Sequence, residues 1–254
     1  MTHLSVNVNK IATLRNARGH DLPNVVQVSR DIIQFGADGI TVHPRPDERH
    51  IKKNDVYELL ELMNEEKDKN PKLEFNIEGY PSEDFLELID RVRPDQCTLV
   101  PDPPHVITSN AGWSLVERKA DLKKILQLLR DIQVRSSLFM DPVDNSPKQF
   151  EALRELNPDR IELYTEAFAK SYEIGYLEKT MYGYKDLARA ATLSGIGINA
   201  GHDLNQKNLK TLLTEIPKIL EVSIGHALIC EALYQGLSQT IASYKNIICD
   251  CHGS

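Results

Sequence analysis

Short apolar or alternating runs recur along this chain, and each is followed by an amphipathic segment with helical spacing. Strand followed by helix, eight times over, is typical of a parallel sheet built from βαβ units. We expect the strands at residues 4–9, 39–44, 73–78, 96–101, 134–140, 160–165, 195–200 and 221–226. We expect the helices at residues 24–36, 54–67, 82–92, 121–132, 148–156, 177–195, 208–216 and 227–248.

Eight such units predict an α/β protein whose sheet closes into a (β/α)8 barrel, or TIM barrel, with residues 1–254 as a single domain. The length of 254 residues agrees with the roughly 250 residues of such barrels. No linker rich in proline, serine or glycine divides the chain. An open doubly wound sheet is the alternative, but it usually has fewer strands, and no GxGxxG motif follows the first strand here.

Composition excludes several classes of protein. The apolar fraction of 41% is enough for a sizeable core, and no run approaches the roughly 18 apolar residues of a membrane span. A net charge of −7 argues against nucleic acid as a partner. The N-terminus carries no signal-peptide pattern, and four cysteines make no disulfide framework, so we expect a cytoplasmic protein.

The C-terminal stretch Cys249-Asp250-Cys251-His252 resembles a metal clip. Nothing nearby in the sequence supplies further ligands, and structural zinc sites need four. A frayed tail is the favoured interpretation, and we expect no metal there.

Several predicted strands keep one polar face. Ser5 and Asn7 alternate with apolar residues in the first strand, Glu74 and Glu78 do so in the third, and Glu162 in the sixth. In a barrel the apolar face contacts the helices and the other face lines the lumen. Buried polar groups without partners cost about 1–3 kcal/mol each. The pattern therefore predicts a lumen with a hydrogen-bonded network, ordered water or a substrate cavity; a solvated edge strand would explain only the first strand.

Histidines gather where the predicted strands end, which is where TIM barrels place their active sites. A lone histidine in such a place is more often structural. Four of the eight histidines together with two lumen carboxylates favour acid/base chemistry or metal binding. These residues are His43, His50, His202, His226, Glu74 and Glu162.

Two features indicate anion binding. The backbone amides of Gly225 and His226 open a predicted helix, where the helix dipole favours an anion; steric need for glycine at such a turn is the alternative. Basic side chains also cluster in two loops that follow predicted strands, and a solvated charge run is the alternative for either loop alone. These side chains are Lys10, Arg15 and Arg18 in the first loop and Arg45, Arg49 and His50 in the second.

At these residues the sequence resembles the pyridoxine 5'-phosphate synthases, the ring-closing enzymes of vitamin B6 biosynthesis. The matching stretches run in family order from residue 6 to residue 229. They are "VNVNKIATLRNARG", "GADGITVHPRPDERHI", "LEFNIEGYPSED", "CTLVPDPPHVITSNAGW", "SSLFMDP", "INAGHDLN" and "SIGHALI".

The resemblance implies a (β/α)8 barrel that assembles as a homo-octamer. It implies a transferase that condenses 1-deoxy-D-xylulose 5-phosphate with 3-amino-2-oxopropyl phosphate, giving pyridoxine 5'-phosphate, phosphate and water. No metal, redox cofactor, nucleic acid or membrane is implied. Repeated proton transfers at several carbons suit imidazoles and carboxylates distributed around a barrel.

The resemblance also assigns roles. By motif, His43 is a general base, Glu74 a second proton acceptor, His202 the proton donor, and Glu162 a residue that assists charge development. The deoxyxylulose phosphate would be bound by Arg45, His50 and Thr108. The aminoketone phosphate would be bound by Asn7, Arg18, the backbone of Asp203, Gly225 and His226.

Two positions depart from the family pattern. Many members have Asp-His where this chain has Asn9-Lys10, so a carboxylate acceptor is lost there, and we assign neither residue to the site. The residue after His202 is often glycine and is Asp203 here, which would be strained if its φ were positive.

Two other functions use the same residues. A non-catalytic phosphate-binding barrel would need the basic loops and Gly225-His226 but not Glu74, Glu162 and His202 together. A metal-dependent hydrolase or aldolase would use His43, His202 and His226 as ligands, and chelators would abolish its activity.

Overall fold

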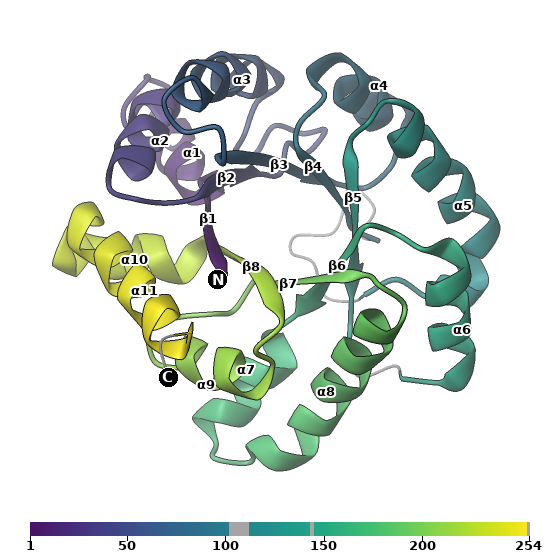
Figure 1. Cartoon of the computed structure of the whole chain (residues 1–254). Helices are drawn as coiled ribbons and strands as arrows, with labels where there is room; N and C mark the ends of the chain where they lie inside the picture. Colours follow the sequence, from purple (N-terminus) through teal and green to yellow (C-terminus); the bar gives the residue numbers. More distant parts are fainter. Residues whose placement is uncertain (102–111, 143–144, 253–254) are drawn as a thin grey trace.

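The computed structural model describes residues 1–101, 112–142 and 145–252. Eight parallel strands close into a barrel in the order β1 to β8, with β8 pairing back onto β1 (Figure 1). They are β1 (His3–Asn7), β2 (Gly39–Val42), β3 (Glu74–Gly79), β4 (Gln96–Leu99), β5 (Arg135–Met140), β6 (Arg160–Tyr164), β7 (Gly197–Gly201) and β8 (Ile219–Ile224). The predicted TIM barrel is confirmed.

Helices surround the barrel (Figure 1). They are α1 (Asn9–Asn16), α2 (Val25–Gln34), α3 (Lys53–Lys67), α4 (Glu83–Val92), α5 (Leu115–Asp131), α6 (Pro147–Leu156), α7 (Glu166–Glu173), α8 (Leu177–Leu193), α9 (Leu209–Glu215), α10 (His226–Gln235) and α11 (Leu237–His252). None of the helices in the described part of the chain is both long and apolar enough to cross a membrane.

Local chemistry explains where several helices begin. The side chain of Asn24 accepts a hydrogen bond from the Gln27 backbone at the start of α2, and Ser82 does the same for Phe85 at the start of α4. Such caps satisfy backbone donors that the first turn leaves unpaired. At α6, the cap residue Ser146 is followed by a proline, whose fixed φ suits the first helical position.

The helix predicted at 227–248 is wrong as a single element. It is two helices, α10 and α11, separated by Gly236 with φ of 79°. Glycine adopts this left-handed conformation without a steric penalty, and it ends α10. The prediction also missed α1, whose first residue Asn9 we had placed in a strand, and α7, which lies between β6 and α8.

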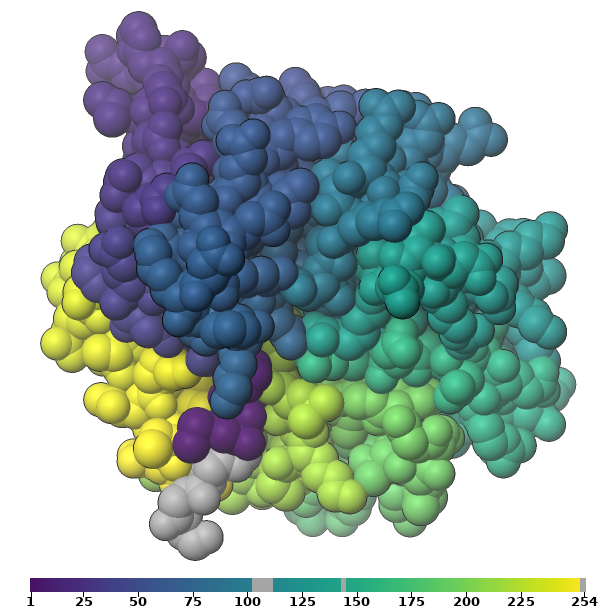
Figure 2. Space-filling model, turned by 45° about the horizontal axis from the view of Figure 1, so that its top comes forward, coloured from purple at the N-terminus to yellow at the C-terminus, as the bar shows by residue number. Residues whose placement is uncertain are grey.

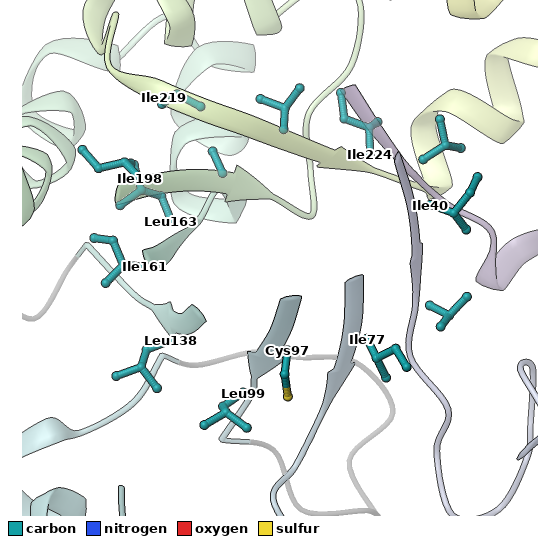
Figure 3. Packing of buried hydrophobic residues seen from close by; sticks show 14 of the residues in the cluster. Ile40, Ile77, Cys97, Leu99, Leu138, Ile161, Leu163, Ile198, Ile219 and Ile224 are labelled. Carbon is teal, nitrogen blue, oxygen red and sulfur yellow. The ribbon is translucent and has the colours of Figure 1, made fainter. Parts of the chain in front are cut away.

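The outward face of the barrel forms the main apolar core. Side chains such as Ile40, Ile77, Leu138 and Ile198 are buried, and Figure 3 shows them on the outer side of the strands, facing the helices. Because successive strand residues point to opposite faces, the residues between them point into the lumen.

The lumen is polar, as the alternation predicts. Hydrogen bonds connect neighbouring strands through Ser5 and Thr41 (2.7 Å), Asn76 and Thr41 (3.3 Å), and Thr98 and Asn76 (3.0 Å). This network satisfies groups that burial would otherwise penalise.

Ion pairs close the amino-terminal end of the lumen. Arg135 from β5 donates two hydrogen bonds to the carboxylate of Glu74 at the start of β3. Arg160 from β6 lies 3.3 Å from Glu221 of β8. Charge pairs at this end of a TIM barrel serve stability, because the chemistry takes place at the opposite end.

Candidate active site

Asn7, His43, Glu78, Glu162 and His202 all lie at or near the carboxyl ends of their strands. The Oε2 atom of Glu78 is 3.8 Å from Nδ1 of His43 and 3.4 Å from the Nδ2 donor of Asn7. The charges of His202 and Glu162 also interact with that of Glu78. Five strands or strand ends thus contribute to one cluster.

Asn9 fixes the end of β2. Its Oδ1 accepts a hydrogen bond from the backbone N–H of His43 at 3.0 Å, and its own N–H donates to Oδ1 of Asn7 at 3.0 Å. The amide oxygen of Asn9 is thus an acceptor for the backbone at the end of β2. The sequence left the role of Asn9 open because the partner is a backbone group.

His43 is a neutral imidazole near neutral pH. Burial lowers the pKa of His43 well below its ordinary value, and the positive charges of Arg45 and His50 act in the same direction. A neutral imidazole can accept a proton. The geometry therefore suits a general base.

Glu78 titrates close to neutrality. Burial raises the pKa of Glu78 to about 7, although the charges of His202 and Arg45 oppose this rise. Such a carboxyl can release and take up a proton at physiological pH. Sequence analysis placed Glu78 on the lumen face but gave it no role.

Glu162 is almost fully buried, at 3% exposed. Burial, and next the negative charge of Glu78, raise its pKa well above the ordinary value. Its Oε2 atom has no hydrogen-bond partner, so one acceptor in the lumen is available to a ligand. Gly201 on β7 makes room for it, because a Cβ at that position would overlap Oε1 of Glu162.

His202 has the opposite charge preference from His43. Burial lowers its pKa, but the hydrogen bond from Nδ1 to Oδ2 of Asp203 (2.7 Å) and the charges of Asp203 and Glu78 outweigh this and raise the net pKa. The left-handed conformation lies at His202 itself, with φ of 96°, and not at Asp203. Unusual φ values in non-glycine residues cluster at functional sites. A protonated His202 suits a proton donor.

The Asp203 backbone N–H, expected to hold a phosphate, donates instead to Oγ1 of Thr165 at 3.1 Å. Thr165 Oγ1 in turn donates to the Gly201 carbonyl at 2.7 Å. Phosphate binding at this amide would therefore replace the Thr165 contact.

A cavity of about 80 Å³ opens beside His43, lined also by Arg45, Lys53, Tyr80 and Ser82 among others. The two cations, Arg45 and Lys53, outnumber the one carboxylate in the lining, Asp84, and with the two hydroxyls they suit an anionic ligand.

His50 lies near His43, which lines this cavity, and the centroids of the two rings are 6.2 Å apart. Burial first, and then the charges of Arg45 and Lys10, lower the pKa of His50 to about 4. The two predicted basic loops therefore act on one imidazole. Arg15 does not join them as a free cation, because it pairs with Asp55 and donates to the His50 carbonyl, holding that loop in place.

Gly225 lies directly against Asn7. A Cβ on Gly225 would be 3.0 Å from the Cβ of Asn7 and 3.1 Å from its backbone oxygen. His226, the first residue of α10, is exposed. Of the two residues predicted to share a phosphate with Asn7, Gly225 is thus adjacent to it, and His226 follows Gly225 in the chain.

Three predicted site residues are not brought into this cluster by the contacts described. Glu74 lies at the amino-terminal end of β3 with Arg135. Arg18 is exposed and lies between α1 and α2. Figure 2 shows a purple, N-terminal part of the chain projecting from the body of the molecule. Thr108 lies outside the described residues.

Metal ligation finds no support in the described residues, which contain no group of three or more His, Cys, Asp or Glu side chains placed to hold an ion. The arrangement is instead an imidazole of lowered pKa (His43), an imidazole of raised pKa (His202) and two carboxyls of raised pKa (Glu78 and Glu162) in one cluster. Such a set can take a proton from one carbon and give one to another.

Solved structures with low sequence identity share the fold. The tryptophan synthase alpha chain of Legionella pneumophila superposes with a TM-score of 0.63 at 14% identity, covering 97% of this chain and 91% of that one. The 3-hexulose-6-phosphate synthase of Salmonella typhimurium gives 0.63 at 11% identity, covering 99% and 100%. At such identities the likeness concerns the barrel alone.

Sequence relatives are much closer. The pyridoxine 5'-phosphate synthase of Bacteroides thetaiotaomicron is 50% identical over 248 residues, which cover 98% of this chain and 100% of that protein. The protein of the same name from Christiangramia forsetii is 49% identical with the same coverage. The profile of the family described as "Pyridoxal phosphate biosynthesis protein PdxJ" matches residues 4–250. This chain therefore belongs to the PdxJ family of pyridoxal phosphate biosynthesis proteins.

Proposed function

We propose that the chain is a pyridoxine 5'-phosphate synthase that condenses 1-deoxy-D-xylulose 5-phosphate with 3-amino-2-oxopropyl phosphate. One observation carries the proposal beyond family membership. His43, a buried imidazole of lowered pKa, lies 3.8 Å from Glu78, and His202, an imidazole of raised pKa, interacts with the charge of the same carboxyl. Ring closure needs a base and an acid at different atoms of one bound intermediate, and this pair supplies both.

In this proposal His43 removes protons from carbon as the condensation proceeds, and His202 protonates leaving oxygens as water and phosphate depart. Glu162, with its unpartnered Oε2, faces positive charge that develops on the imine nitrogen. The polar lumen below these residues accommodates expelled water. The condensation forms C–N and C–C bonds and expels phosphate and water with no net change of oxidation state, so the proposal needs proton transfers and no metal or redox cofactor.

Glu74 keeps the role of second proton acceptor only as a prediction. Its carboxylate accepts a hydrogen bond from Arg135. Burial alone would raise the pKa of Glu74, but the hydrogen bond and the positive charge of Arg135 outweigh burial, so the pKa is lowered. To accept a proton it would have to leave that ion pair.

Two phosphate groups would occupy two places at the mouth. The deoxyxylulose phosphate would contact Arg45 and His50. Thr108 would contact it as well, which is a prediction from the sequence alone. The aminoketone phosphate would contact the amides of Gly225 and His226 next to Asn7, with Arg18 and the Asp203 N–H as further donors. The positive charges around His50 offset the net charge of −7 for an approaching dianion.

Purified protein incubated with both phosphates tests the proposal. The expected result is pyridoxine 5'-phosphate, identified by its absorbance and mass, with one inorganic phosphate released per product. Either substrate alone should give neither. Absence of product under conditions in which the Bacteroides thetaiotaomicron relative forms it would overturn the proposal. A homo-octamer in the cytoplasm remains part of the proposal, and the mass of the assembly in solution tests the octamer.

A further inference from the structure

We propose that Glu78 is a positioning and proton-holding residue of this site: its carboxyl orients the His43 imidazole and takes over the proton that His43 removes. This inference rests on the proposed function and deepens it. It adds to the set of residues that the family resemblance assigns, which includes Glu74 of the same strand but not Glu78.

Glu78 lies near the carboxyl end of β3. Glu74 and Glu78 are both on the lumen face, four residues apart, and so about 13 Å apart along the strand. Glu74 is at the amino-terminal end, and Glu78 is at the carboxyl end, where TIM barrels carry out chemistry. The Glu78 side chain is 13% exposed, which leaves it open to the mouth of the barrel.

The partners of Glu78 differ from those of the other lumen glutamates Glu74 and Glu221. Glu74 and Glu221, at the other end of the lumen, contact the guanidinium groups of Arg135 and Arg160. Glu78 instead contacts an imidazole, an amide and the hydroxyl of Ser223. An Arg partner favours the charged form of a carboxylate, whereas the partners of Glu78 tolerate both its charged and its neutral form.

The charged and titratable groups that act on Glu78 come from several elements. They are His43 and Arg45 after β2, Glu162 on β6 and His202 after β7. Cations on two sides favour the charged carboxylate, while Glu162 and burial favour the neutral acid. Glu78 is therefore balanced between the two forms, and Glu78 and Glu162 do not readily carry charge together.

The proton transfer balances. With Glu78 charged, Nδ1–H of His43 points at Oε2, which leaves Nε2 with the free lone pair. Nε2 takes a proton from substrate carbon, and the Nδ1 proton passes to Glu78. His43 ends neutral and Glu78 ends as the acid, ready to return its proton later. The 3.8 Å separation must shorten for this, as catalytic hydrogen bonds often do when ligands bind.

Glu78→Gln tests the inference, and Glu221→Gln is the matched control, because Glu221 is also a buried lumen glutamate whose pKa burial raises to about 7. We expect Glu78→Gln to lower kcat by about 10²-fold or more with KM changed by less than about threefold. In the wild type, kcat should fall as the pH drops below about 7, because Glu78 becomes protonated. This fall should be absent in Glu78→Gln and present in Glu221→Gln. Glu78→Asp should recover part of kcat together with the pH dependence.

A second measurement needs no substrate and covers the case in which Glu78→Gln is unstable. Long-range ¹H–¹⁵N spectra report which nitrogen of His43 carries the proton. We expect the Nδ1–H tautomer in the wild type and in Glu78→Asp at pH 8, and a shift toward Nε2–H in Glu78→Gln. An active wild type with unchanged kcat, pH profile and tautomer in Glu78→Gln would overturn this inference and leave the proposed function standing. Absence of product from the wild type would instead overturn the function.

Discussion

The side-chain oxygen of Asn9 accepts a hydrogen bond from the backbone N–H of His43 at 3.0 Å. The first residue of α1 thereby holds the residue that follows β2. This contact ties the start of α1 to the candidate general base.

Asn9→Ala should therefore lower kcat by about tenfold, because His43 loses the anchor that fixes its backbone. Asn9→Asp preserves the acceptor and should stay within about threefold of the wild type. Steady-state kinetics of both variants check this. Equal kcat for Asn9→Ala and the wild type would contradict a positioning role.

Gly201→Ala should disable the site by moving Glu162, since the new Cβ would overlap the Glu162 carboxylate. We expect kcat to fall by about 10²-fold and the free energy of unfolding by about 1–3 kcal/mol. Gly197→Ala is the control on the same strand, because its Cβ would meet the Arg160 side chain, 3.0 Å away, at the other end of the lumen. Loss of activity in the control as large as in Gly201→Ala would argue against a specific effect on Glu162.

The pH dependence of stability follows from the buried carboxyl of Glu221. Burial raises its pKa to about 7 in the folded chain, whereas the unfolded chain has the ordinary value. Between about pH 4.5 and pH 7 the folded state binds more protons than the unfolded state, so this group makes the free energy of unfolding fall as pH rises, by up to about 3 kcal/mol. Below that window the penalty is absent, and above it the penalty is complete and constant.

Urea unfolding at pH 5 and pH 7.5 measures this effect in the wild type and in Glu221→Gln. Comparing the two proteins cancels the contributions of all other groups. The variant should lose less stability than the wild type on going to pH 7.5. A parallel decline in both would show that Glu221 does not titrate in this range.

Metal removal should leave product formation unchanged. The proposed steps are proton transfers and eliminations that imidazoles and carboxyls carry out. The assay is product formation after dialysis against a chelator, with elemental analysis of the protein. Loss of activity that returns on adding a divalent cation would favour the hydrolase or aldolase alternative.

Much of this structure could be predicted from periodicity. Eight strands, their approximate bounds and the polar lumen follow from the alternation of residues such as Glu74, Asn76 and Glu78. Periodicity identifies which face of the sheet a residue is on, but not which side chains surround it at its level along the barrel axis. The ion pair of Glu74 with Arg135 depends on a strand 61 residues away, and the sequence offered no signal for it.

Other features depend on single backbone conformations. The break at Gly236 could have been suspected from glycine within a long helical run, but glycine is also tolerated inside helices. The positive φ of His202 could not be predicted, because only a few per cent of non-glycine residues adopt one. The hydrogen bond of Asn9 to the His43 backbone joins two loops whose approach only the closed barrel defines.

Whether His43 is a general base can be measured with His43→Gln, through the rate of pyridoxine 5'-phosphate formation from the two phosphates. We expect kcat to fall by about 10²–10⁴-fold with KM for both substrates nearly unchanged, since a general base acts mainly on the transition state. A rise in KM with kcat preserved would contradict it, because His43 would then only bind substrate.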